Sequence, residues 1–192
     1  MPLIISAYVY DFSGYYNLSW LNSFNLTDSK DIQILNINAG FDETSFTIKN
    51  YFPKSDLKVF DFYNAEKHTE PAIIRARKVS LVYPNTQQII SSSIPLKDNS
   101  VDCIFLLSAA HEIRSQNEKI MFLKECHRVC KSNANIIMVE HLRDFPNFIA
   151  FSVGFTHFFS KLTWRKAFDK AGFKTFTEQK FTPFMSIFNS CP

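Results

Sequence analysis

Polar side chains that could do acid–base or ligand-binding chemistry follow several apolar runs of the sequence. Asp61 ends one such run, His111 comes shortly after another, and His141 directly follows a third. A carboxylate at the end of a strand can accept hydrogen bonds from both hydroxyls of a ribose, and histidine suits a base because its pKa lies near neutral pH. The alternative for each residue is a structural role in a turn or a loop.

The elements that must position these residues alternate between strands and helices. Strands are predicted at Ile32–Ile37, Leu57–Asp61, Gln87–Ser91, Val101–Leu107, Ile136–Glu140, Phe173–Glu178 and Phe184–Phe188. Helices are predicted at Asp42–Phe52, Ala65–Val79, Glu118–Cys130 and Lys161–Ala171, the last ended by Gly172 as a left-handed cap. This order predicts an α/β fold with a Rossmann-like, doubly wound and mostly parallel sheet of about seven strands, one of them antiparallel near the C-terminus. Ligands of such sheets bind beyond the carboxyl ends of the strands.

Composition excludes several classes of protein. The 192 residues indicate one domain, and four scattered glycines exclude a P-loop and a full dinucleotide fingerprint, which disfavours a nicotinamide dehydrogenase. The net charge of +3 does not indicate a nucleic-acid partner, and the basic run Arg75–Lys78 is interpreted as the solvated face of a helix.

Features of localisation and assembly are also readable. No signal peptide or membrane span is predicted, and the four cysteines do not form a disulfide scaffold, so a soluble cytoplasmic protein is expected. Cys126, His127 and Cys130 are interpreted as packing residues, and no metal site is predicted. A homodimer is left open.

The order of motifs resembles the class I S-adenosylmethionine-dependent methyltransferases, closest to their type 11-like, small-molecule branch. The matching segments are Tyr10–Asn17, Ile34–Gly40, Ile94–Asp102, Ala110–Ile113, Phe122–Lys131 and Ile137–Leu142. The resemblance implies a single domain over residues 1–192, in which residues 1–30 form a cap over the cofactor and residues 145–160 an acceptor-side insertion.

The resemblance further implies S-adenosylmethionine as cofactor and transfer of its methyl group to a small aromatic or lipid-like acceptor. The cofactor-binding residues it implies are Asn36, Asn38, Ala39, Gly40, Asp61, Phe62, Ser91, Ser92 and Leu107. His111 and His141 are the candidate catalytic residues, each as a base for an acceptor proton. Glu112 and Glu140 are second choices, and Glu140 is expected to pair with Arg143 or Lys161.

Aromatic residues indicate the acceptor side. Six of the sixteen residues from Phe145 to Ser160 are Phe, which suits a flat or long apolar acceptor. The residues predicted to bind it are Tyr10, Tyr15, Phe148, Phe151 and His157. The same spacing of Phe also describes the buried face of a helix, and this alternative stays open.

Departures from the family pattern concern the cofactor. Asn36 stands where the family has an acid, Asn38 and Asp42 replace glycines, and Ile90 stands in place of the acid that contacts adenine. Asp61 is then the one family carboxylate anchor that remains. Two alternatives therefore stay open: a methyltransferase-fold binding or accessory protein that has lost the cofactor, and non-methyl chemistry in the same pocket.

Overall fold

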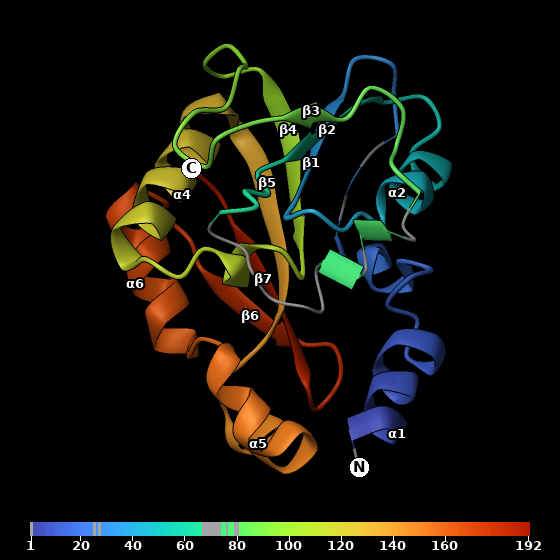
Figure 1. Cartoon of the computed structure of the whole chain (residues 1–192). Helices are drawn as coiled ribbons and strands as arrows, with labels where there is room; N and C mark the ends of the chain where they lie inside the picture. Colours follow the sequence, from blue (N-terminus) through green and yellow to red (C-terminus); the bar gives the residue numbers. More distant parts are fainter. Residues whose placement is uncertain (1, 25, 27, 67–73, 76, 79–80) are drawn as a thin grey trace.

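The computed structural model describes residues 2–24, 26, 28–66, 74–75, 77–78 and 81–192. Its sheet has the strand order β3-β2-β1-β4-β5-β7-β6 (Figure 1). The strands are β1 Gln33–Asn38, β2 Asp56–Asp61, β3 Gln87–Gln88, β4 Val101–Leu107, β5 Cys130–His141, β6 Thr177–Lys180 and β7 Met185–Ser190. Every pair from β3 to β5 is parallel, whereas β7 is antiparallel to both β5 and β6. The predicted fold class is therefore confirmed.

Helices cover both faces of this sheet. They are α1 Pro2–Ser6, α2 Ser45–Tyr51, α4 Gln116–Val129, α5 Phe145–Phe151 and α6 Lys161–Ala171, with a π-helix at Ala7–Phe12 and 3₁₀ turns at Ser19–Ser23, Ala110–Glu112 and Ser152–His157. The predicted helix Ala65–Val79 lies largely outside the described residues. None of the helices in the described ranges is long and apolar enough to cross a membrane.

Alternation along the strands divides the core into two halves. Leu35 and Ile37 of β1 pack with α4 and α6 on one face, where Trp164 is fully buried. Ile34 of the same strand packs on the other face with Ile48 of α2 and with the N-terminal segment. Strand β4 is buried on both sides except at Asp102, as expected for a central parallel strand covered by helices.

Several element boundaries differ from the prediction, and strand β5 begins at Cys130 rather than Ile136. Helix α2 begins at Ser45 rather than Asp42, because the Asp42 carboxylate accepts the backbone N–H groups of Thr44 and Ser45 and so holds the chain in a turn before the helix. Strand β3 is only two residues long, because the chain turns at Ile90, which bridges to Ser93. Strand β6 begins at Thr177 rather than Phe173.

The cap of α6 at Gly172 predicts a difference between two glycine substitutions. Gly172 has φ +102°, so Gly172→Ala should lower the free energy of unfolding by about 1–2 kcal/mol through backbone strain alone, since the nearest atom to the new Cβ would be His127 Nε2 at 3.6 Å. Gly154 has no positive φ and its Cβ would meet Phe151 at 3.7 Å. Gly154→Ala should therefore leave the free energy unchanged or raise it by up to about 1 kcal/mol. Urea unfolding of both variants measures this, and equal losses would contradict the assignment of the cap.

Candidate functional site

Three cavities follow the carboxyl ends of the parallel strands. The first, of about 400 Å³, lies between the ends of β1 and β4 and the N-terminal tyrosines. Its lining includes Tyr10, Tyr15, Tyr16, Asn36, Asn38, Ala39, Phe41, Glu43, Leu107, Ser108, His111 and Glu112. The second has about 140 Å³ and the third about 560 Å³. Asn38 lines both the first and the second cavity, and Gln88 lines both the second and the third. The three cavities therefore lie in a row across the sheet edge.

The residues predicted to bind a cofactor all line this row. Asn36, Ala39 and Leu107 line the first cavity, Gly40 and Asp61 the second, Phe62, Ser91 and Ser92 the third, and Asn38 both the first and the second. Residues from four separate segments of the sequence are thus brought to one edge of the sheet, as the strand-end rule requires.

The prediction that the basic run Arg75–Lys78 is only a solvated face is wrong for Arg77, because its side chain contacts the cavity residues Asp61 and Gly40. Its guanidinium donates to Asp61 Oδ2 and to the Gly40 carbonyl, both at 3.1 Å, and lies 4.1 Å above the ring of Tyr63. Asp61 Oδ1 accepts the backbone N–H of Tyr63 at 2.8 Å. A carboxylate has about four acceptor positions, so Asp61 can still accept ligand hydroxyls. Arg75 and Lys78 are exposed, as predicted.

Gly40 lets these groups come together. Its φ is +92°, and a Cβ there would lie 2.7 Å from the ring of Tyr63 and 2.8 Å from Arg77 Nη1. No other residue type fits both the conformation and the space.

Asn36 serves the fold as well as the cavity. Its buried amide nitrogen donates to Thr44 Oγ1 at 3.2 Å and to Ser45 Oγ at 2.8 Å. These bonds hold the start of α2 against the end of β1. An acid at this position could not donate them, because a carboxylate only accepts.

The two residues that replace family glycines each carry an unpartnered atom. Asn38 Oδ1 accepts the Gly40 N–H at 3.3 Å, while Asn38 Nδ2 is buried and has no hydrogen-bond partner. Asp42 Oδ2 is likewise buried and unpartnered, and both residues line the second cavity. A buried donor or acceptor without a partner costs about 1–3 kcal/mol, so both atoms favour a polar ligand between them.

His141 reaches the first cavity through Tyr10. The His141 ring is buried, and its Nδ1 lies 3.0 Å from the Phe184 carbonyl, which can only accept a hydrogen bond. The proton therefore belongs on Nδ1, and Nε2 accepts the Tyr10 hydroxyl at 3.1 Å. Burial lowers the pKa of His141 against a smaller opposite effect of the bond to Phe184, so the ring is neutral at pH 7.

His111 lies between two glutamates. Its Nδ1 is 2.7 Å from Glu140 Oε2 and its Nε2 is 3.2 Å from Glu112 Oε1. Burial lowers the pKa of His111, but the charge of Glu140 and the hydrogen bonds to both carboxylates raise it more, to about 10. The ring therefore holds its proton at neutral pH and does not suit the role of a base.

The expected partners of Glu140 are wrong. Lys161 instead pairs with Glu178, and Arg143 donates to the carbonyls of Phe158 and Thr156. Both cations lie on the segment that follows β5. Glu140 at the end of β5 instead contacts His111, which lies on the loop after the neighbouring strand β4.

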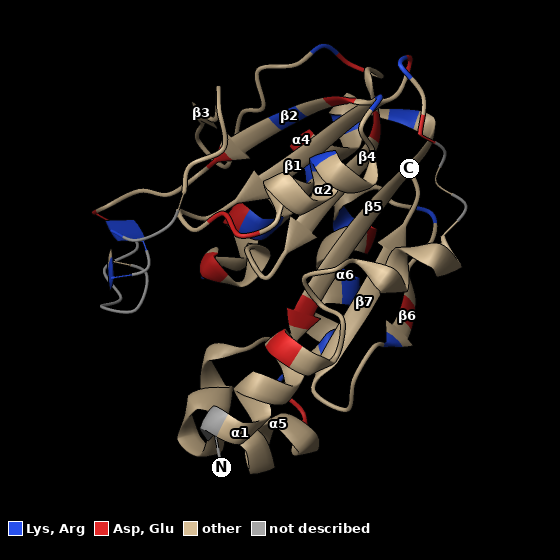
Figure 2. Cartoon of the chain, turned by 90° about the vertical axis from the view of Figure 1, so that its right-hand side faces the viewer, with Lys and Arg blue, Asp and Glu red and all other residues tan. Residues whose placement is uncertain are grey.

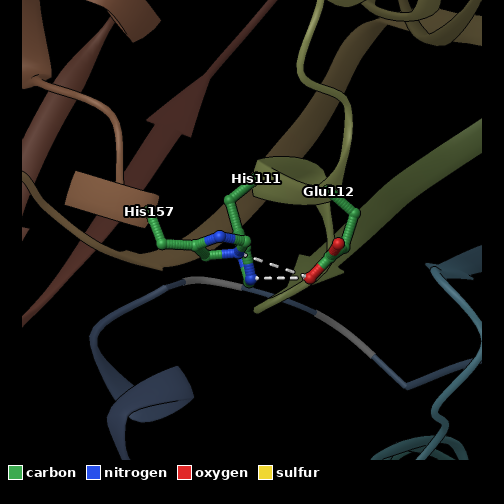
Figure 3. Close-up of side chains that lie close together, drawn as sticks. All are labelled: His111, Glu112 and His157. Atoms are coloured by element: carbon green, nitrogen blue, oxygen red, sulfur yellow. Dashed lines mark ion pairs between the residues drawn. The ribbon is translucent and has the colours of Figure 1, made fainter. Parts of the chain in front are cut away.

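The residues predicted on the acceptor side separate into two groups. Tyr10 and Tyr15 line the first cavity, while Phe148, Phe151 and His157 are not among the lining residues of the cavities described above. Phe151 packs on the ring of His141 at 5.0 Å between centroids. His157 lies 3.7 Å from Glu112 Oε1 (Figure 3).

Sequence reasoning missed several residues of the site. Tyr15 donates to Ser108 Oγ at 3.0 Å, Tyr16 donates to Glu43, and Arg114 donates to the carbonyls of His111 and His157 at 3.1 and 2.6 Å. Ser108 directly follows the predicted strand Val101–Leu107, so the strand-end rule could have found it, whereas Glu43 stands inside a predicted helix. Arg114 carries no comparable signal in the sequence.

Comparisons with known proteins agree with this architecture. Residues 63–138 match the family model described as "Methyltransferase domain". No curated protein matches the chain.

Solved structures are similar over nearly the whole chain. A SAM-dependent methyltransferase from Aquifex aeolicus superposes with a TM-score of 0.61 at 17% identity, covering 99% of this chain and 97% of that one. A putative methyltransferase of Haloferax volcanii, solved with the Trm112 activator, gives 0.60 at 11%, covering 92% and 89%. Geranyl diphosphate C-methyltransferase from Streptomyces coelicolor, solved with Mg²⁺, geranyl diphosphate and S-adenosylhomocysteine, gives 0.62 at 8%, covering 90% and 76%. The predicted resemblance to class I methyltransferases is confirmed, and the chain has their fold.

The neutral, buried His141 predicts how stability changes with pH. Because its pKa is lowered on folding, the unfolded chain binds a proton first as the pH falls below about 6.5. The free energy of unfolding should then fall toward acid more steeply in the wild type than in His141→Gln, by at most about 1.4 kcal/mol per pH unit. Urea unfolding between pH 7.5 and 5 measures both slopes. Equal slopes would mean that His141 titrates alike in the two states.

Proposed function

We propose that this chain transfers a methyl group from S-adenosylmethionine to a small aromatic or lipid-like acceptor. The observation that carries the proposal is the row of three cavities along the strand ends, with Asp61 and two unpartnered polar atoms at its centre. An extended ligand with apolar ends and a polar middle suits such a row.

The residues of the row fit the parts of this cofactor. Asp61 would accept the ribose hydroxyls, Phe62 and the third cavity would hold the adenine, and Asn38 Nδ2 would donate to the methionine carboxylate. Asn36 carries no charge to attract the methionine ammonium, and Glu43 in the lining of the first cavity is the candidate for that role. When bound, the cofactor would supply an electrophilic methyl group.

The first cavity suits the acceptor. Tyr10, Tyr15, Tyr16 and Phe41 give it aromatic walls. Residues 1–30 thus act as a cap in this proposal. Residues 145–160 are proposed for the acceptor side because they belong to an uncharged end of the molecule. Helices α1 and α5 lie next to each other there (Figure 2). Neither Pro2–Tyr10 nor Phe145–Ser160 contains a Lys, Arg, Asp or Glu. An apolar acceptor is favoured by both features.

A proton path leads from this cavity to His141. An acceptor hydroxyl in the cavity can donate to the Tyr10 oxygen while Tyr10 donates to His141 Nε2, which is unprotonated. The acceptor hydroxyl would transfer its proton to the Tyr10 oxygen while Tyr10 transfers its own proton to His141 Nε2, so that His141 would act as the base. His111 would hold positive charge at the cavity wall.

The compartment proposed is the cytoplasm. Cys103, Cys126 and Cys130 are free thiols in the core, which supports a reducing environment. A homodimer is compatible with this proposal but is not required by it, because every residue named above comes from one chain.

A second candidate function is a binding protein that keeps the fold without the cofactor. The ion pair between Arg77 and Asp61 favours it, because the guanidinium takes up part of the hydrogen-bonding capacity of the carboxylate. Titration with cofactor separates the two functions.

Asp61 should dominate cofactor affinity. Asp61→Asn should weaken binding of S-adenosylhomocysteine by about 10- to 100-fold, because hydrogen bonds to a charged acceptor are lost. Isothermal titration measures the affinity. Asp56→Asn, at the exposed opposite end of β2, is the matched control and should bind as the wild type does. No heat with the wild type at millimolar ligand would overturn the cofactor assignment and favour the binding protein.

Arg77 should compete with the ribose for Asp61. Arg77→Gln removes a partly exposed ion pair and should tighten S-adenosylhomocysteine binding by up to about fivefold. Arg75→Gln, on the same basic run but exposed, should leave the affinity unchanged. Weaker binding by Arg77→Gln would show instead that the guanidinium contacts the ligand.

A further inference from the structure

We propose that His111, Glu112 and His157 bind one divalent first-row transition-metal ion of the zinc type at the rim of the first cavity. The two imidazoles and the carboxylate converge on one point from two separate turns (Figure 3). The site is built from different side chains from those that would hold the cofactor, and two of its residues, His111 and Glu112, also line the cavity proposed for the acceptor.

The distances between the candidate ligand atoms fit a small cation. Glu112 Oε1 lies 3.2 Å from His111 Nε2 and 3.7 Å from His157 Nε2, and the three ligand atoms all lie within 4.8 Å of one another. Ligands about 2.0–2.1 Å from a tetrahedral ion lie about 3.3 Å apart. The 3.7 Å between Glu112 Oε1 and His157 Nε2 is therefore close to the spacing that such an ion requires.

Burial leaves room for a further ligand. The side chains of His111 and Glu112 are 15% and 10% exposed, and that of His157 is 26% exposed. His111 and Glu112 also line the first cavity. Three protein ligands with an open fourth position facing a cavity are typical of zinc sites that bind small molecules rather than of closed structural sites.

Two further residues hold the ligands in place. Glu140 binds His111 Nδ1 at 2.7 Å, which leaves Nε2 directed at the centre of the cluster. Such a carboxylate on the far nitrogen is the usual partner of a metal-binding histidine. Arg114 donates to the carbonyls of both His111 and His157, so it clamps the two turns that carry the imidazoles.

The two carboxylates around His111 suit a cation. Glu112 and Glu140 are 8% and 1% exposed and place two negative charges around the ring of His111. A proton on Nε2 compensates part of this charge, and a divalent ion would take its place and compensate more of it. Two imidazole nitrogens and one carboxylate oxygen suit Zn²⁺, Fe²⁺ or Co²⁺ better than Mg²⁺ or Ca²⁺, which prefer oxygen ligands.

Metal titration of the purified full-length chain, after chelator treatment and without S-adenosylmethionine, tests the site. With Zn²⁺ in the calorimeter we expect about one equivalent bound, and with Co²⁺ we expect visible ligand-field bands of a site with imidazole ligands. His157→Gln and Glu112→Gln should each weaken Zn²⁺ binding by at least about tenfold, and Glu140→Gln by about 10- to 100-fold.

The matched control is His127→Gln. His127 packs against Phe173 on the α4–α6 side of the sheet, away from the cluster, so this variant should bind Zn²⁺ as the wild type does. Thermal unfolding checks that each variant folds. If Glu112→Gln or Glu140→Gln does not fold, the result for His157→Gln is the deciding one, because His157 is the most exposed of the three ligands. The proposal is overturned if the wild type binds no stoichiometric Zn²⁺, or if His157→Gln binds it as tightly as the wild type.

Discussion

The site depends on the buried carboxylate of Glu140, which ties the loop after β4 to the end of β5. One oxygen accepts the backbone N–H of His111 at 3.2 Å and the other lies 2.7 Å from the ring of the same residue. An unpaired charge buried at this depth costs several kcal/mol, so the two contacts with His111 hold the loop against the end of β5. These contacts place His111 and Glu112 at the wall of the first cavity. The end of β5 also carries His141, which accepts a hydrogen bond from Tyr10 in the same wall.

The sheet could be predicted from the sequence because its signal is local. The run Val101–Leu107 is apolar throughout and became the central strand β4 with the same bounds. The start of α6 at Lys161 and its end before Gly172 were also predicted. In the structure the Ser160 side chain caps the first turn, and Gly172 takes the left-handed conformation expected of it. Strand β3 was overestimated because a turn at Ile90 depends on its pairing with Ser93, which apolar periodicity does not show.

The site could be predicted only as far as strand ends define it. All nine residues expected to bind a cofactor line the row of cavities, because the carboxyl ends of parallel strands meet at one edge. Contacts made by the connections were not predictable in the same way. Arg77 reaches Asp61 from a basic run that looked solvated, and His157 reaches Glu112 from a segment that looked like an aromatic face. Both contacts depend on where a connection folds back, and no pattern in a single sequence carries that information.

Scarcity of glycine changes how the first loop can hold a ligand. In a glycine-rich loop the backbone itself approaches the ligand, whereas here only Gly40 allows such an approach. Asn38 and Asp42 instead direct side-chain atoms toward the same space, and one atom of each has no protein partner. Since an unpartnered buried group destabilises the folded chain by about 1–3 kcal/mol, a ligand that satisfies both atoms recovers that energy on binding. In the proposed function the loop would therefore hold its ligand through side-chain hydrogen bonds, one of them from the neutral donor of Asn38, in place of backbone contacts.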